Sequence, residues 1–117
     1  MNATANSKEF YKRFTQYNIP SDNYDCSEIA EDLYNIAKSL GLKGSIVRLK
    51  NNHDRFGLVT VIECDEPVPF EYHDIFLLDG NVYDPRFSKK REKVKQNKYY
   101  ELVEQINTNI IDFEVLE

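Results

Sequence analysis

The strongest periodic pattern of apolar side chains lies in residues 25–41. Apolar residues recur there every three or four positions, the spacing of one face of a helix: Ile29, Ala30, Leu33, Tyr34, Ile36, Ala37 and Leu40. Asp25 suits the N-cap and Glu28 follows three residues later, which is the capping-box arrangement. Gly41 is a typical C-terminal stop. The pattern predicts a helix of about four turns that is apolar enough to form the centre of the core.

Two shorter helical patterns lie nearer the ends of the chain. Residues 7–16 carry Phe10, Tyr11 and Phe14 at helical spacing, and the turn-forming segment 19–23, which contains Pro20, ends that pattern. Residues 98–106 repeat the helical spacing. We therefore expect a first helix over 7–16 and a late helix over 98–106.

Elsewhere the apolar pattern is typical of strands, which we predict over 45–49, 56–64, 70–78, 81–84 and 110–115. Asp79-Gly80 favours a two-residue hairpin between the third and fourth of these strands. Pro67 and Pro69 interrupt the chain before them. Because helices come first and a run of strands follows, the chain predicts an α+β fold, with the central helix packed on an antiparallel sheet.

Length and charge narrow the classes of protein and partner. The 117 residues fit one domain over residues 1–117. A net charge of −5 argues against nucleic acid as a partner, because phosphate binding needs a positive surface. No apolar run is long enough to cross a bilayer, so we expect no membrane partner. The basic residues over 86–98 are typical of a solvated, mobile loop, which is the interpretation we favour. The alternative is that they form a docking patch for an acidic partner.

Cys26 is the first candidate for chemistry, because it takes the first helical position after the Asp25 cap. The amides of a first turn have no partners within the helix, and the helix dipole is positive there. Both features favour a thiolate and supply N–H donors for an oxyanion beside the sulfur. The alternative is a small buried side chain that continues the apolar stripe of the helix. Periodicity alone does not choose between the two.

The Asp79-Gly80 hairpin brings a histidine and a carboxylate together. A two-residue loop places Ile75 opposite Asp84, and His73 shares the face of Ile75 because strand side chains alternate. His73 is then a diagonal cross-strand neighbour of Asp84. A carboxylate beside an imidazole fixes its tautomer, and an imidazolium beside a thiolate is an activated nucleophile. The alternative is a purely structural hydrogen bond.

The remaining polar candidates have weaker patterns. We interpret His53 as part of an exposed loop, and Cys64 as a packing residue at the end of a strand. The cysteines and histidines have no close spacing that indicates zinc, so no metal and no cofactor is expected. A side-chain oxyanion donor is expected before Cys26, and three residues are candidates: Gln16, Asn18 and Asn23.

The order of these features resembles the papain-like superfamily. Cys26 opens a helix, Gly-Leu-Lys-Gly-Ser-Ile-Val-Arg-Leu follows, and Tyr-His-Asp-Ile-Phe-Leu-Leu-Asp-Gly-Asn-Val-Tyr-Asp-Pro carries the histidine and aspartate. The order Cys, His, Asp over residues 24–85 is similar to transglutaminase-like members and to the small papain-fold toxin domains of bacterial polymorphic toxins. Ser27 departs from the aromatic residue usual after the nucleophile in papain-type peptidases.

The resemblance implies Cys26 as nucleophile, His73 as general base and acid, and Asp84 as orienting carboxylate. It implies acyl transfer on protein amide groups, as a peptidase, isopeptidase or glutamine deamidase. It also implies a protein substrate, a cognate immunity protein, and a cytoplasmic location or delivery into a target cell within a larger toxin. Two alternatives are a catalytically inactive interaction module on the same fold and, from the acidic charge alone, an immunity or antitoxin-like protein.

Overall fold

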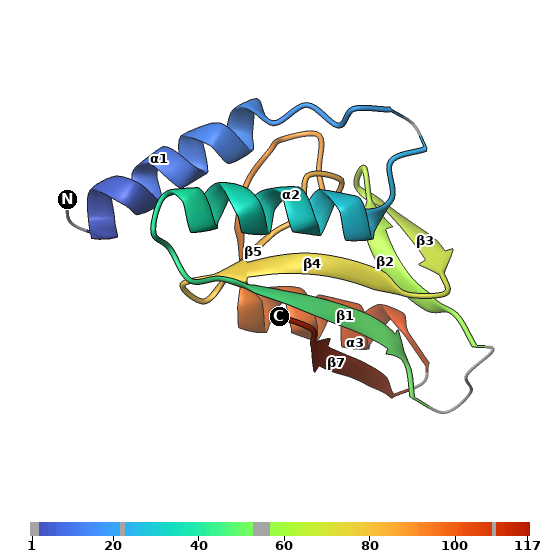
Figure 1. The fold of residues 1–117 in the computed structure, drawn as a ribbon. Helices are drawn as coiled ribbons and strands as arrows, with labels where there is room; N and C mark the ends of the chain where they lie inside the picture. Colours follow the sequence, from blue (N-terminus) through green and yellow to red (C-terminus); the bar gives the residue numbers. More distant parts are fainter. Residues whose placement is uncertain (1–2, 22, 53–56, 109) are drawn as a thin grey trace.

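A computed structural model of the protein describes residues 3–21, 23–52, 57–108 and 110–117 (Figure 1). The elements in chain order are α1 (Ala3–Gln16), α2 (Cys26–Ser39), β1 (Ser45–Asn51), β2 (Val59–Glu63), β3 (Glu66–Phe70), β4 (His73–Leu78), β5 (Asn81–Tyr83), β6 (Val94–Lys95), α3 (Gln96–Ile106) and β7 (Ile111–Val115). In the described part of the chain, no helix is both long and apolar enough to span a membrane.

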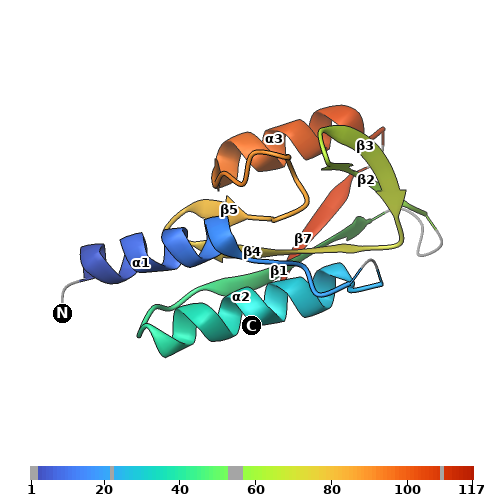
Figure 2. The same cartoon turned by 90° about the horizontal axis from the view of Figure 1, so that it is seen from above.

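The strands form one five-stranded sheet and one separate hairpin. The sheet has the order β6-β5-β4-β1-β7, and each neighbouring pair is antiparallel. Among the described residues, strands β2 and β3 pair only with each other. Helix α2 lies on one face of the sheet and α3 lies on the other, as the view from above shows (Figure 2), and Phe10 and Phe14 of α1 pack in the cluster on the α2 side. The predicted α+β class and the antiparallel sheet are therefore confirmed.

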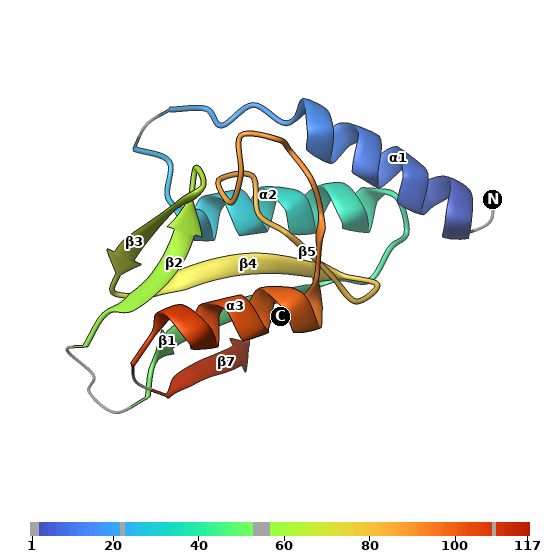
Figure 3. The ribbon, with the colours of Figure 1, turned by 180° about the vertical axis from the view of Figure 1, so that it is seen from behind.

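The sheet has a separate apolar cluster on each face, because side chains alternate along a strand. Phe76 and Leu78 of β4 join the side chains of α1 and α2. Ile75 of β4 joins Tyr99 and Val103 of α3 on the opposite face, where α3 lies in front of the sheet in Figure 3. Strand β4, which begins with His73, is the middle strand of the sheet and lies between the two apolar clusters.

Helix α2 begins as its sequence predicts. The Asp25 side chain accepts a hydrogen bond from the Glu28 backbone at 2.9 Å, and the Glu28 side chain accepts one from the Asp25 backbone. Gly41 follows the helix with φ of +73°, a left-handed conformation that glycine adopts without steric cost. The capping box therefore fixes the helix start at Cys26.

The β4–β5 hairpin also has the predicted register. Leu78 pairs with Asn81, and Asp79 and Gly80 both have positive φ, as a two-residue turn between twisted strands requires. The polar pair His73 and Asp84 lies beyond the paired residues of this hairpin, and both residues are buried.

Several sequence predictions were wrong in detail. Pro67 and Pro69 do not interrupt the fold, because both lie within β3. This strand pairs with β2 along one edge, and its other edge makes no strand hydrogen bonds that a proline would break. Strand β4 begins at His73 rather than residue 70, because Phe70 belongs to β3. Cys64 is exposed in the β2–β3 turn instead of packed. His53 lies outside the described residues.

The basic stretch over 86–98 is more ordered than predicted. It contains β6, which pairs with β5, and the first residues of α3. The Arg91 guanidinium donates hydrogen bonds to the carbonyl oxygens of Phe14 and Tyr17 at the end of α1. Lys89 and Lys90 are exposed, as a solvated segment requires. The prediction of a solvated loop therefore holds for these lysines but not for Arg91.

Candidate active site

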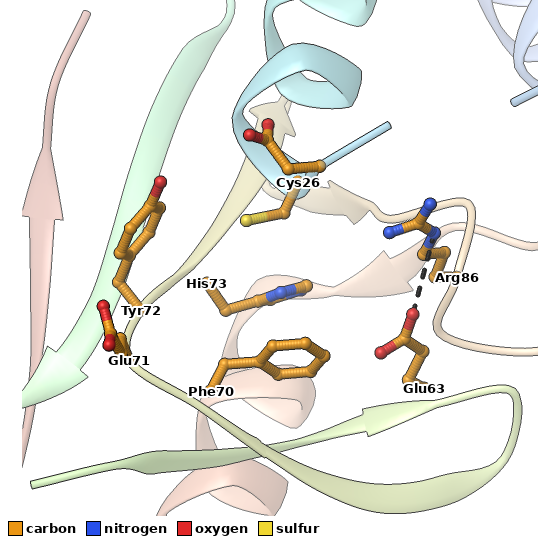
Figure 4. Close-up of a pocket in the computed structure, with 8 residues that line it drawn as sticks. Cys26, Glu63, Phe70, Glu71, Tyr72, His73 and Arg86 are labelled. Atoms are coloured by element: carbon orange, nitrogen blue, oxygen red, sulfur yellow. Dashed lines mark ion pairs between the residues drawn. The ribbon is translucent and has the colours of Figure 1, made fainter. Parts of the chain in front are cut away.

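A cavity of about 270 Å³ opens where α2 begins and the β2–β3 hairpin meets the sheet. It contains the predicted nucleophile and the predicted histidine (Figure 4). The lining residues are Asp25, Cys26, Glu63, Phe70, Glu71, Tyr72, His73 and Arg86. The cavity therefore combines residues from α2, β2, β3, the β3–β4 turn, β4 and the segment after β5.

Cys26 is the first residue of α2, and it is a half-buried free cysteine. In Figure 4 its sulfur lies on the side of the His73 side chain opposite Phe70. Both side chains line the same cavity, and Cys26 is among the groups that raise the pKa of His73, through its hydrogen-bonding capacity and its charge. Cys26 is therefore neither a buried packing residue nor an isolated surface thiol.

His73 is held on its other side by Asp84. The Nε2 atom of His73 lies 2.7 Å from Oδ2 of Asp84, and both side chains are almost fully buried. The second carboxylate oxygen of Asp84, Oδ1, accepts the backbone N–H of Arg86 at 3.0 Å. Because Asp84 occupies Nε2, the ring nitrogen available to Cys26 is Nδ1.

The surroundings of His73 favour its protonated form. Burial by itself lowers the pKa of an imidazole, but the charge and hydrogen bond of Asp84, followed by those of Cys26, outweigh it. The net effect raises the pKa of His73 from 6.5 to about 10. At neutral pH the ring beside the sulfur is therefore an imidazolium.

Phe70 fixes the plane of the His73 ring. Its own ring stacks on the imidazole with the centroids 5.9 Å apart and an interplanar angle of 30°. Figure 4 shows Phe70 on the side of the imidazole opposite the Cys26 sulfur. The ring is thus held between the thiol and an apolar surface, while Asp84 sets its rotation.

Arg86 connects three parts of the site. Its backbone N–H donates to Asp84, and Nη2 of its guanidinium donates to the carbonyl oxygen of Tyr24 at 2.6 Å. Its Nε atom lies 3.6 Å from Oε1 of Glu63 on the cavity wall. Since Tyr24 immediately precedes the Asp25 cap, Arg86 ties the entry to α2 to the segment that carries Asp84.

Tyr72 closes the cavity on the side away from Arg86 (Figure 4). Its hydroxyl lies 3.3 Å from the Ser27 hydroxyl, and the Arg48 guanidinium lies over its ring at 4.1 Å. Arg48 is itself held by two hydrogen bonds to the buried Asp74, at 2.8 and 3.0 Å. These contacts give the residue before His73 a fixed position beside the first turn of α2.

The sequence predicts a site of Cys26, His73 and Asp84; in the structure Cys26 and His73 line one cavity, and Asp84 is paired with His73. The sequence analysis missed Arg86, which it assigned to the basic stretch, although a position two residues after Asp84 was a usable signal. The three residues proposed as oxyanion donors are exposed and do not line the cavity: Gln16, Asn18 and Asn23. Within the described ranges, no group of three His, Cys, Asp or Glu side chains is arranged to hold a metal ion.

Comparisons with known proteins add no relative: no family model, no curated protein and no solved structure matches the chain.

Proposed function

We propose that the protein is a cysteine-dependent acyl-transfer enzyme with a papain-like arrangement, acting on amide groups of proteins. The observation that carries the proposal is the position of the buried His73 ring, between the Asp84 carboxylate and the Cys26 sulfur at the start of a helix. A buried imidazolium beside a thiol has a direct use in nucleophilic catalysis. A structural hydrogen bond needs only His73 and Asp84, and it does not account for the sulfur.

The reaction follows from the protonation states. The Cys26 thiolate attacks the amide carbonyl carbon and forms a carbon–sulfur bond. The His73 imidazolium then gives its proton to the leaving nitrogen as the carbon–nitrogen bond breaks, which leaves a thioester and a neutral imidazole. His73 next removes a proton from water or an amine, which attacks the thioester and restores the thiolate.

The tetrahedral intermediate carries a negative oxygen that needs donors. The Cys26 and Ser27 amides lie in the first turn of α2, where backbone N–H groups have no partner within the helix. The Arg86 guanidinium is a side-chain donor on the wall of the same cavity. We assign it the role that the sequence analysis gave to a residue preceding Cys26.

The size of the cavity favours one type of amide. A volume of about 270 Å³ lies just below the range of pockets that hold drug-sized ligands. Such a space suits one inserted side chain better than several residues of extended peptide. Among the reactions of this class, the cavity therefore favours glutamine side-chain deamidation or transamidation over peptide-bond cleavage.

The partners implied by the papain-like resemblance belong to the same proposal. They are a protein substrate and, for a toxin domain, a cognate immunity protein. The inactive interaction module receives less support, because Arg86 and Arg91 of the basic stretch bind backbone carbonyls within the protein. Arg91 is therefore engaged within the protein, and the N–H groups of Arg86 that remain line the cavity instead of an outer docking surface.

Alkylation of the two cysteines by iodoacetamide tests the proposal, because Cys64 is an exposed thiol in the same chain. At pH 7 an unperturbed thiol is only a few per cent ionised, so an activated Cys26 should react about tenfold faster than Cys64. His73→Ala should remove the difference without changing the rate at Cys64. Mass spectrometry of tryptic peptides measures both rates, and equal rates at the two cysteines in the wild type would contradict the proposal.

A second measurement addresses the reaction itself. A glutamine-containing peptide incubated with the protein should release ammonia, and the thioester on Cys26 should appear in the mass of the acid-quenched protein. Cys26→Ala is the control that should lose both signals while retaining the far-UV circular dichroism spectrum. If ammonia release is the same in Cys26→Ala, the side-chain amide reaction assigned to this site is wrong.

A further inference from the structure

Tyr99 is a buried residue with a polar group that the fold does not satisfy. It lies in the first half of α3, and only 1% of its surface is exposed. Its hydroxyl has no hydrogen bond of ordinary geometry to any of the described residues. Buried hydroxyl groups almost always have a partner, so an exception needs a physical explanation.

The position of Tyr99 relates it to the active site. Its ring packs against Phe87, with the centroids 5.5 Å apart, and the backbone N–H of Phe87 donates to the carbonyl oxygen of Asp84 at 3.1 Å. Tyr99 also shares an apolar cluster with Val82, whose side chain lies on the same face as that of Asp84 by strand alternation. Tyr99 therefore packs directly against the turn that carries Asp84.

The electrostatic surroundings agree with this placement. Burial is the largest cause that raises the pKa of Tyr99, and the Asp84 carboxylate follows through its charge and proximity. Cys26 and Tyr100 are the other titratable groups that affect it. Asp84 is thus the principal acceptor near the Tyr99 hydroxyl.

Asp84 has the capacity for another donor. Its Oδ2 atom bonds His73 and its Oδ1 atom bonds the backbone of Arg86, whereas an ionised carboxylate has about four acceptor sites. We propose that the hydroxyl of Tyr99 donates a third hydrogen bond to Asp84, which makes Tyr99 a positioning residue for His73. The hydrogen bond itself does not depend on the proposed function; only its effect on catalysis rests on that proposal.

A third donor changes how the carboxylate acts on the imidazole. It holds the carboxylate in one rotation and withdraws electron density from the oxygen that faces His73. The hydrogen bond from His73 is then weaker than it would be to a carboxylate with two donors. This moderates the stabilisation of the imidazolium, so His73 can release its proton to the leaving nitrogen more easily.

Tyr99→Phe tests the inference because it removes one oxygen and keeps the buried ring. Tyr100→Phe is the matched control, since Tyr100 is adjacent on α3 and stacks on Phe113 at 3.9 Å instead of facing Asp84. The main readout is the downfield proton resonance of the His73 ring N–H in ¹⁵N-labelled protein. His73→Gln, which lacks this resonance, provides the assignment.

In Tyr99→Phe, the His73 ring proton should move further downfield and the ring should titrate at higher pH, because Asp84 has lost a competing donor. The Tm should fall by about 5 °C or more, the loss expected for a hydrogen bond to a charged group. Tyr100→Phe should change neither His73 readout. An unchanged His73 resonance and titration in Tyr99→Phe overturns the inference, whatever the Tm does, since a packing role alone would leave both unmoved.

The outcome is separable from that of the proposed function. If iodoacetamide labels Cys26 no faster than Cys64 but the His73 resonance moves in Tyr99→Phe, the positioning contact stands and the enzymatic proposal fails. If Cys26 is activated and the resonance does not move, the enzymatic proposal stands and Tyr99 has no part in it.

Discussion

The raised pKa of His73 predicts a pH dependence of stability that isolates the His73–Asp84 pair. The test uses the double variant Cys26→Ser, Cys64→Ser, in which no thiol titrates. The pKa of His73 is raised in the folded state, chiefly by Asp84 against the opposing effect of burial, from an ordinary value of 6.5. The stabilisation is therefore complete below pH 6.5 and is lost as the pH rises toward the folded-state pKa.

The magnitude follows from the difference of one proton between the folded and unfolded states. The free energy of unfolding should fall by up to about 1.4 kcal/mol per pH unit while the unfolded imidazole is neutral and the folded one is charged. Between pH 7 and 9 the expected loss is therefore at most roughly 2–3 kcal/mol, because the double variant lacks the part of the pKa increase that comes from Cys26.

Urea denaturation at half-unit pH steps measures this loss. The same double variant carrying His73→Gln is the reference, and subtraction of its curve removes the contributions of all other groups. A difference between the two curves that stays constant from pH 6 to 9 would refute the reasoning, because it would mean that Asp84 does not hold a proton on His73.

The stability of the wild-type protein is expected to depend less on pH than that of the double variant. A folded thiolate–imidazolium pair holds one proton, which is the number held by a neutral thiol and a neutral imidazole in the unfolded chain. The wild-type stability should therefore vary less between pH 7 and 8 than that of the double variant. An equally steep loss in both proteins would indicate a neutral thiol beside His73.

Three substitutions give further expectations. Arg86→Gln should slow the acylation of Cys26 by p-nitrophenyl acetate about 10²–10³-fold. Alkylation of Cys26 by iodoacetamide forms no oxyanion, so its rate should not change. An equal loss of both rates would assign Arg86 a structural role instead. Asp84→Asn should lower the acylation rate by up to about 10⁴-fold, measured in the same assay, and a normal rate would remove Asp84 from the mechanism. Asp25→Ala should cost about 1 kcal/mol of stability in urea denaturation, and no loss would show that the capping box is not needed to start α2.

The sequence predicted the parts of the fold that depend on neighbouring residues. The start of α2 follows from Asp25 and Glu28, and the β4–β5 register follows from Asp79-Gly80. Both are local decisions, made by capping and turn geometry within a few residues. The pairing of His73 with Asp84 is a consequence of that register, so it could be predicted as well.

The contacts that the sequence did not predict join residues far apart in the chain. Arg86 reaches the carbonyl oxygen of Tyr24 across 62 positions, and no periodic pattern contains that information. Phe70 was assigned to the wrong strand because its apolar neighbours resemble a continuation of β4. The role of Pro67 depends on whether β3 is an edge strand, which only the tertiary structure decides.

Cys26 and His73 lie close together for a geometric reason that combines local features of the sequence with long-range packing. Helix α2 packs on the face of the sheet that contains Phe76, whereas strand alternation assigns His73 to the face covered by α3. A residue within β4 on that face would be separated from α2 by the sheet itself. His73 is the first residue of β4, and α2 begins at the same end of the sheet, so the thiol reaches the ring around the strand end (Figures 1 and 4). The capping box at Asp25 therefore determines more than helix stability, because a helix that began one turn later would leave Cys26 outside the first turn and away from His73.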